Sequence, residues 1–192
     1  MKITYFILTG ALLAQSALSI AGTQTEIWEK LRGGGLVVLM KHTAVPEDSE
    51  QAANLFLRDP SCKNERNLSV DGKTQAIKIG EKFINNNVSV DKVLNSPYCR
   101  TTDTAMLSFN SSNPTDFLTL PIELSPDQGE KHQSQLKEQI RSFSGKGNLV
   151  LITHDVNISS ISFETIKRNT ALVVQPMGEG GFEELGTIQI FD

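Results

Sequence analysis

Two unbroken apolar segments constrain the fold of this chain more than any other feature. Residues 36–40 read Leu-Val-Val-Leu-Met, and residues 148–153 carry Leu-Val-Leu-Ile at their centre. A strand with one solvent-exposed face alternates apolar and polar residues, whereas a strand covered on both faces is apolar throughout. Both segments are therefore predicted to be central strands of a sheet that has helices on each side.

The rest of the chain alternates between helix and strand patterns. Helices are predicted over residues 26–32, 70–84, 101–109, 127–142 and 157–167. Further strands are predicted over residues 90–95, 117–120, 171–175 and 185–191. Ser69 is the expected N-cap of the second helix, and the face of that helix expected to be buried consists of Ala76, Ile77, Gly80, Phe83 and Ile84. The alternation predicts an α/β fold, a three-layer α/β/α sandwich with a mostly parallel central sheet.

The N-terminal segment has the pattern of a secretory signal peptide. Lys2 precedes an apolar run over residues 3–14, and small residues at positions 19 and 21 fit cleavage before Gly22. An uncleaved anchor is the alternative, but the run is shorter than the roughly 20 apolar residues of a membrane span. We therefore expect residues 1–21 to be the signal peptide of a periplasmic or secreted protein, without stable membrane insertion. Residues 22–192 are expected to form a single domain.

In an exported protein, the two cysteines of the sequence, Cys62 and Cys99, are expected to lie in an oxidising compartment. In an oxidising compartment such a pair commonly forms a disulfide, and two buried free thiols are the alternative. The net charge of −4 argues against a broad electrostatic surface for nucleic acid, so an anionic substrate would need a locally basic pocket. Nothing in the sequence indicates an oligomeric state.

Reactive side chains follow three of the predicted strands. Lys41 and His42 follow the first apolar run, Arg100 lies shortly after residues 90–95, and His154 and Asp155 follow the second apolar run. Each of these residues alone has an ordinary structural explanation. Because open α/β sheets bind ligands beyond the carboxyl ends of their strands, their joint occurrence predicts one shared site.

Four segments, in order, resemble the conserved blocks of the histidine phosphatase (phosphoglycerate-mutase-like) superfamily. They are LVVLMKHTA at 36–44, NLSVDGKTQAIKIGEKF at 67–83, VLNSPYCRTTDTA at 93–105 and NLVLITHDVNI at 148–158. The lead segment from Trp28 to Gly34 is similar to exported bacterial members, including phosphatases of the lipopolysaccharide core. The resemblance implies a phosphoglycerate-mutase-like fold.

The resemblance also implies an activity and a set of site residues. It implies a phosphomonoesterase that needs no metal or cofactor and forms a phosphohistidine at His42. The residues expected to bind phosphate are Lys41, His42, Arg66, Arg100 and His154; for Arg66, a surface charge on a long loop is the alternative. The expected substrate is a small phosphorylated molecule or a phosphorylated glycan. A Cys62–Cys99 bridge would tie the loop over residues 43–67 to the strand end that bears Arg100.

Two questions stay open within this resemblance. The proton donor to the leaving group is either Asp155, which directly follows His154, or Glu123, which follows the predicted third strand. Lys41 stands where the family has arginine, and lysine lacks the planar fork that grips two phosphate oxygens. A phosphate-binding or interaction protein with impaired turnover is therefore the alternative function. A metal-dependent hydrolase with His42, His154 and Asp155 as ligands is a further alternative, but the sequence lacks a characteristic spacing for it.

Overall fold

The computed structural model describes residues 24–47, 56–162 and 166–192 of the chain. The strands of these residues form one five-stranded sheet with the order β2-β3-β1-β4-β5. The strands are β1 Val37–Lys41, β2 Val90–Asn95, β3 Asn148–Thr153, β4 Thr170–Pro176 and β5 Phe182–Gln189. The predicted signal peptide, residues 1–21, lies outside the described residues.

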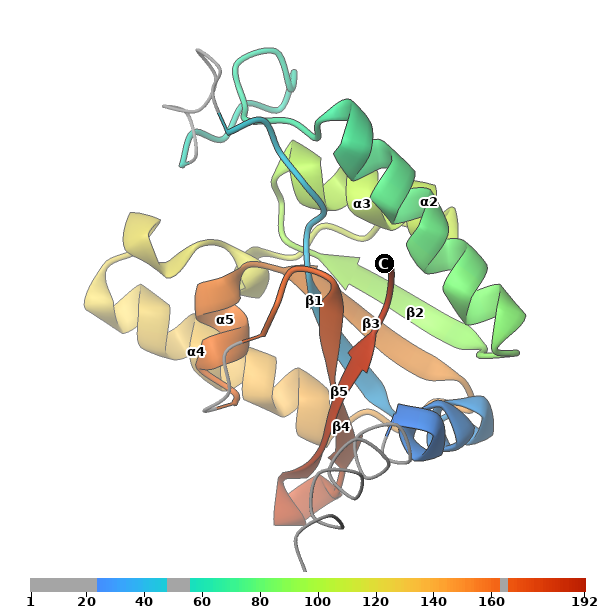
Figure 1. Cartoon of the computed structure of the whole chain (residues 1–192). Helices are drawn as coiled ribbons and strands as arrows, with labels where there is room; N and C mark the ends of the chain where they lie inside the picture. Colours follow the sequence, from blue (N-terminus) through green and yellow to red (C-terminus); the bar gives the residue numbers. More distant parts are fainter. Residues whose placement is uncertain (1–23, 48–55, 163–165) are drawn as a thin grey trace, which may run out of the picture.

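Helices cover both faces of the sheet (Figure 1). They are a helix over residues 24–33, α2 Val70–Asn85, α3 Cys99–Phe109, α4 Pro126–Arg141 and α5 Asp155–Ser159. Three short 3-10 turns accompany them: η2 Asp116–Leu118, η3 Pro121–Glu123 and η4 Gly178–Gly180. The helix over residues 24–33 packs with α2 and α3 into one hydrophobic core, and α4 and α5 pack into a second. The predicted three-layer α/β/α sandwich is confirmed.

The position of β1 in the middle of the sheet explains why its sequence is apolar throughout. Val38 and Met40 belong to the core beneath α2 and α3, whereas Val37 and Leu39 belong to the core beneath α4 and α5. All four side chains are fully buried, because successive residues of a strand point to opposite faces.

The expectation of a mostly parallel sheet holds only in part. β3 pairs in parallel with β1 and with β2, but β4 pairs antiparallel with β1 and with β5. β4 and β5 form a hairpin closed by the tight turn over residues 177–181, and such a turn joins only antiparallel neighbours. The parallel half of the sheet carries the reactive strand ends.

Three local predictions differ from the structure. The predicted strand over residues 117–120 is the 3-10 turn η2, followed by Pro121, which lacks the N–H that a strand ladder needs. α5 ends at Ser159, far short of residue 167. Ile77 and Ile84 on α2 are 47% and 73% exposed, because the buried face of α2 is instead centred on Ala76, Ile79, Gly80 and Phe83.

The start of α2 is fixed against the loop that leaves β1. Ser69 caps the helix as predicted, because its hydroxyl accepts a hydrogen bond from Gly72 N at 3.0 Å. Ser69 N in turn donates to the carbonyl of Ala44 at 3.0 Å. This contact holds the backbone two residues beyond His42 in a defined place.

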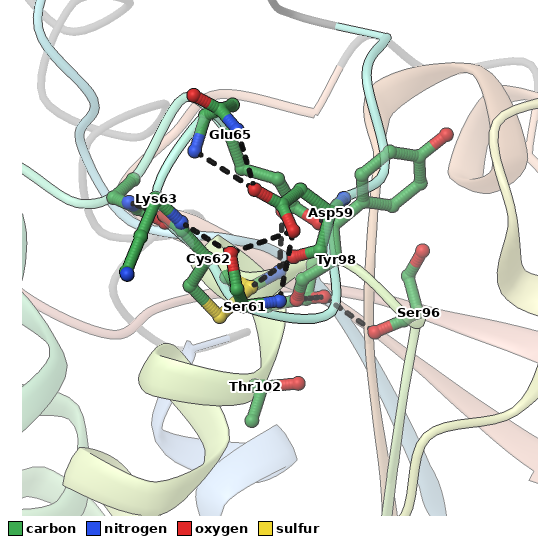
Figure 2. The surroundings of a disulfide bond; sticks show 12 residues. Asp59, Ser61, Cys62, Lys63, Glu65, Ser96, Tyr98 and Thr102 are labelled. Carbon is green, nitrogen blue, oxygen red and sulfur yellow. Dashed lines mark hydrogen bonds between the residues drawn. A yellow bond between two sulfur atoms is a disulfide. The ribbon is translucent and has the colours of Figure 1, made fainter.

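The predicted disulfide is present. Cys62 and Cys99 are bonded, with their Cα atoms 5.8 Å apart. Cys99 is the first residue of α3, so the bridge fastens the loop around Cys62 to the first turn of α3, which also carries Arg100 (Figure 2).

A methyl group at Gly80 should destabilise the packing of α2 on α3. A Cβ atom there would lie 2.2 Å from the carbonyl oxygen of Ser108, so the two helices would have to separate. We expect Gly80→Ala to lower the free energy of unfolding by about 1–3 kcal/mol in urea denaturation. Gly129→Ala on α4 is the matched control, since no atom lies within 4 Å of its Cβ position; it should raise stability by about 0.5–1 kcal/mol. Wild-type stability of Gly80→Ala would contradict the packing described.

Reduction of the disulfide should lower stability by a predictable amount. The bridged residues are 37 positions apart, and opening a loop of that size restores chain entropy worth about 3–4 kcal/mol to the unfolded state. Thermal unfolding with and without reductant measures the loss. The double variant Cys62→Ser/Cys99→Ser should unfold like the reduced protein and show no further response to reductant. A wild type whose melting is indifferent to reductant would contradict this prediction.

Candidate active site

The two histidines lie side by side because β1 and β3 are parallel neighbours in register. Lys41 pairs with Thr153, so the next residue on each strand, His42 and His154, continues the same alignment. His42 N donates to the carbonyl of Thr153 at 3.2 Å, and the two imidazole ring centroids are 5.5 Å apart. Both rings are almost completely buried, with 5% and 4% exposure.

The protonation state of His42 follows from its surroundings. Its Nδ1 lies 2.8 Å from the carbonyl oxygen of Thr43, which can only accept, so Nδ1 carries the hydrogen and Nε2 keeps its lone pair. Burial, followed by the nearby charges of Arg100 and Lys41, lowers the pKa of His42 to about 3. At neutral pH His42 is therefore an uncharged imidazole with a nucleophilic Nε2.

His154 is oriented by the neighbouring strand. Its Nε2 lies 2.9 Å from the hydroxyl of Ser96, the residue that follows β2. Burial lowers the pKa of His154, and the positive charge of Arg100 lowers it further. Two neutral, almost completely buried imidazoles therefore lie next to each other.

Arg100 is the most unusual side chain of the site. It is 0% exposed, and none of its three guanidinium nitrogens has a hydrogen-bond partner among the described residues. Its guanidinium carbon lies 4.3 Å from the centre of the Tyr98 ring. Burial lowers the pKa of Arg100, but an arginine with so high an ordinary pKa stays charged. A buried cation with unmet hydrogen-bond donors is a strong site for an anion.

A pocket of about 200 Å³ joins these groups. The residues that line it are Lys41, His42, Phe56, Arg100, Leu120, His154, Asp155 and Val156. Five of the residues singled out in the sequence therefore line one pocket, together with three apolar side chains. Within this lining, the Lys41 ammonium forms an ion pair with Oδ2 of Asp155.

Two of the predicted residues do not line this pocket. Arg66 Nε donates to the carbonyl of Pro46 at 2.9 Å, so its guanidinium braces the loop after β1. Glu123 accepts a hydrogen bond from the hydroxyl of Tyr98 at 2.5 Å. Burial and this hydrogen bond raise the pKa of Tyr98.

Glu65 is a buried residue of the site region that the sequence did not reveal. It is 1% exposed; its carboxylate accepts hydrogen bonds from Cys99 N at 2.7 Å and from Asp59 N at 2.9 Å (Figure 2). Its negative charge also favours the charged form of Arg100. The available signal was an acidic residue close to the bridged Cys62, and a carboxylate suits the positive end of a helix such as α3.

The described residues give no indication of a metal centre or of a membrane span. No group of three or more histidine, cysteine, aspartate or glutamate side chains in this part of the chain is arranged to hold a metal ion. None of the helices in the described ranges has the length and apolar character to cross a bilayer.

Acid should destabilise the protein through the buried histidines. His42 has a pKa of about 3 when folded and an ordinary value of 6.5 when unfolded, so between these values the unfolded chain binds more protons. The free energy of unfolding that depends on neutral His42 is fully present above about pH 6.5. It is lost as the pH falls toward 3, by on the order of 1 kcal/mol per pH unit. Urea unfolding between pH 7 and 4.5 should show a shallower decline for His42→Gln than for the wild type. Identical slopes would contradict the pKa shift.

Solved structures with the same fold are known at low sequence identity. The protein histidine phosphatase SixA, solved with tungstate, is 15% identical and matches 81% of this chain and 97% of its own, with a TM-score of 0.53. An open reading frame product of Mycobacterium tuberculosis, Rv3214, is 15% identical over 81% of this chain and 98% of its own, with a TM-score of 0.58. A putative α-ribazole-5'-P phosphatase from Escherichia coli is 12% identical over 79% and 94%, with a TM-score of 0.50.

At the level of sequence the chain stands apart from these proteins. No protein-family model matches it, and no curated protein matches its sequence. The structural likeness nevertheless extends over nearly the whole length of each neighbour. The chain therefore has the phosphoglycerate-mutase-like α/β fold that SixA and these other proteins share.

Proposed function

We propose that the protein is a phosphomonoesterase, a member of the histidine phosphatase superfamily that works through a phosphohistidine at His42. The observation that carries this proposal is the buried, unpartnered guanidinium of Arg100 beside the neutral imidazole of His42 in one pocket. A cation without a partner binds the phosphoryl oxygens, and a neutral Nε2 attacks phosphorus. The shared fold with SixA supports the same assignment.

The proposed reaction has two displacement steps. His42 Nε2 attacks the phosphorus of the ester and the bond to the alcohol oxygen breaks. That oxygen takes a proton from an acidic side chain of the site. A water then attacks the phosphorus, the P–N bond breaks, and the proton that water gives up returns to the same group. Arg100, Lys41 and His154 stabilise the charge on the equatorial phosphoryl oxygens in both steps.

Asp155 is the proposed proton donor, because it lines the pocket and Glu123 does not. In the free protein Asp155 pairs with Lys41. A bound phosphate dianion competes for that lysine, so binding of substrate frees the Asp155 carboxyl group from the ion pair.

The substrate class and the location of the enzyme are also proposals. A pocket of about 200 Å³ suits a small phosphorylated molecule or the terminal phosphate of a glycan, such as a lipopolysaccharide core. Export to the periplasm or the medium is proposed from the signal-peptide pattern of residues 1–21, which leaves residues 22–192 as the mature domain. The disulfide is in keeping with an oxidising compartment.

The second candidate function is phosphate binding without efficient turnover. The observation that supports it is the Lys41–Asp155 ion pair. In this pair, the lysine that replaces the family's arginine and the proposed proton donor are bound to each other. A lysine also holds phosphate as a point charge, without a bidentate fork.

Hydrolysis of p-nitrophenyl phosphate in the presence of a chelator tests the proposal. We expect turnover by the wild type and a loss of at least about a thousandfold in His42→Ala, because the nucleophile is removed. His132→Ala is the matched control, since His132 lies on α4 and lines a different pocket. An alkaline quench followed by mass spectrometry should find phosphohistidine at residue 42.

The other outcomes each select a different function. Undiminished turnover in His42→Ala would refute the phosphohistidine mechanism, and loss of turnover on chelation would indicate a metal-dependent hydrolase. Binding of phosphate without turnover would support the second candidate. In that case a gain of turnover in Lys41→Arg would identify the lysine as the cause.

A further inference from the structure

No hydrogen bond fixes the direction of the Arg100 guanidinium. Its nitrogens have no hydrogen-bond partner in the described part of the chain, although the side chain is fully buried. The guanidinium packs on the face of the Tyr98 ring, with its carbon 4.3 Å from the ring centre. A planar guanidinium stacks well on an aromatic face, where the ring attracts the cation.

Tyr98 contacts a second group of the site as well. Its ring meets the imidazole of His154 edge to face, with centroids 5.1 Å apart and an interplanar angle of 88°. Tyr98 is 0% exposed, yet it does not line the pocket. It therefore stands behind Arg100 and His154 and supports both from the protein side.

Glu123 fixes the outer end of the same ring. The Tyr98 hydroxyl donates to Oε2 of Glu123 at 2.5 Å, and Glu123 sits on the turn η3, which begins with Pro121. A hydrogen bond to a carboxylate is stronger than one between neutral groups. The ring is thus held at both ends, since Tyr98 is also the N-cap of α3.

We infer that Tyr98 is a positioning residue that holds the Arg100 guanidinium in place for the phosphoryl group, and that Glu123 fixes the Tyr98 ring. This inference deepens the proposed function and rests on it for the identity of the anion. It assigns Glu123 the role of holding the Tyr98 ring, in place of proton donation.

The order of the Arg100 side chain tests the inference without any ligand. In a ¹⁵N-labelled protein, the Arg100 Nε–Hε resonance is identified by its loss in Arg100→Lys. We expect it to be shifted upfield by the Tyr98 ring current and to have a rigid order parameter in the wild type. In Tyr98→Leu the shift should vanish and the order parameter should fall. A resonance that keeps its shift and rigidity in Tyr98→Leu would overturn the inference.

Binding of inorganic phosphate, measured by calorimetry, tests the consequence for the site. Tyr98→Leu should weaken binding at least tenfold, and Tyr98→Phe, which keeps the ring, should weaken it less. In the Arg100→Ala background, Tyr98→Leu should cause no further loss, because its effect passes through Arg100. Equal losses in both backgrounds would overturn the inference, since they would mean that Tyr98 acts through another group, such as His154, or on overall stability.

The variants of Glu123 separate positioning from proton donation. Glu123→Ala should weaken phosphate binding as Tyr98→Phe does, and Glu123→Gln should restore most of the loss, because its amide oxygen still accepts from the hydroxyl. A Glu123→Gln variant that binds phosphate normally but loses turnover of poorly activated esters would show proton donation and overturn the assignment.

A matched control and the wild type complete the experiment. Phe109→Leu removes another aromatic ring of α3, one that packs edge-on against Phe83 at 5.1 Å outside the pocket lining. It should lower stability but keep phosphate binding and the Arg100 resonance. A wild type that neither binds nor hydrolyses phosphate esters would refute the proposed function, while the Arg100 resonance would still decide the role of Tyr98.

Discussion

The buried guanidinium of Arg100 is the constraint on which the rest of the site depends. A cation with unmet donors in the protein interior is unfavourable, and its place as the second residue of α3, beside the positive end of that helix, adds to the cost. The surrounding structure offsets part of this cost. The Tyr98 ring packs on the guanidinium, and buried Glu65 supplies a negative charge at the helix start. An anion bound beside Arg100 would offset the remainder.

The parallel half of the sheet supplies the chemistry that accompanies this cation. Register between β1 and β3 places His42 next to His154, and burial with nearby positive charge keeps both imidazoles neutral. A strand end is a rigid platform, so an imidazole carried there has a fixed direction relative to an anion bound in the pocket. The antiparallel hairpin of β4 and β5 extends the sheet on the other side of β1.

The sequence was most informative where function depends on regular structure. Lys41, His42, His154 and Asp155 could be placed together because each lies at or just beyond the end of an apolar strand. Ser69 could be placed because an N-cap has a local signature. Glu65, Tyr98 and Glu123 act through contacts between irregular segments, whose course no periodic pattern encodes. Spacing likewise could not show that Arg66 turns to Pro46, or that a lysine at position 41 would pair with Asp155. The antiparallel direction of β4 was missed because a strand buried on both faces has an apolar sequence whichever way its neighbours run.

The central claim is that one anion meets Arg100, His42 and His154 together. The most direct measurement is a crystal structure of the protein soaked with orthovanadate, a mimic of the phosphoryl group in transfer. The account predicts vanadium within bonding distance of His42 Nε2 and vanadate oxygens hydrogen-bonded to the Arg100 guanidinium. An experimental structure in which that guanidinium is instead paired with a carboxylate of the protein, and the vanadate binds elsewhere, would contradict it.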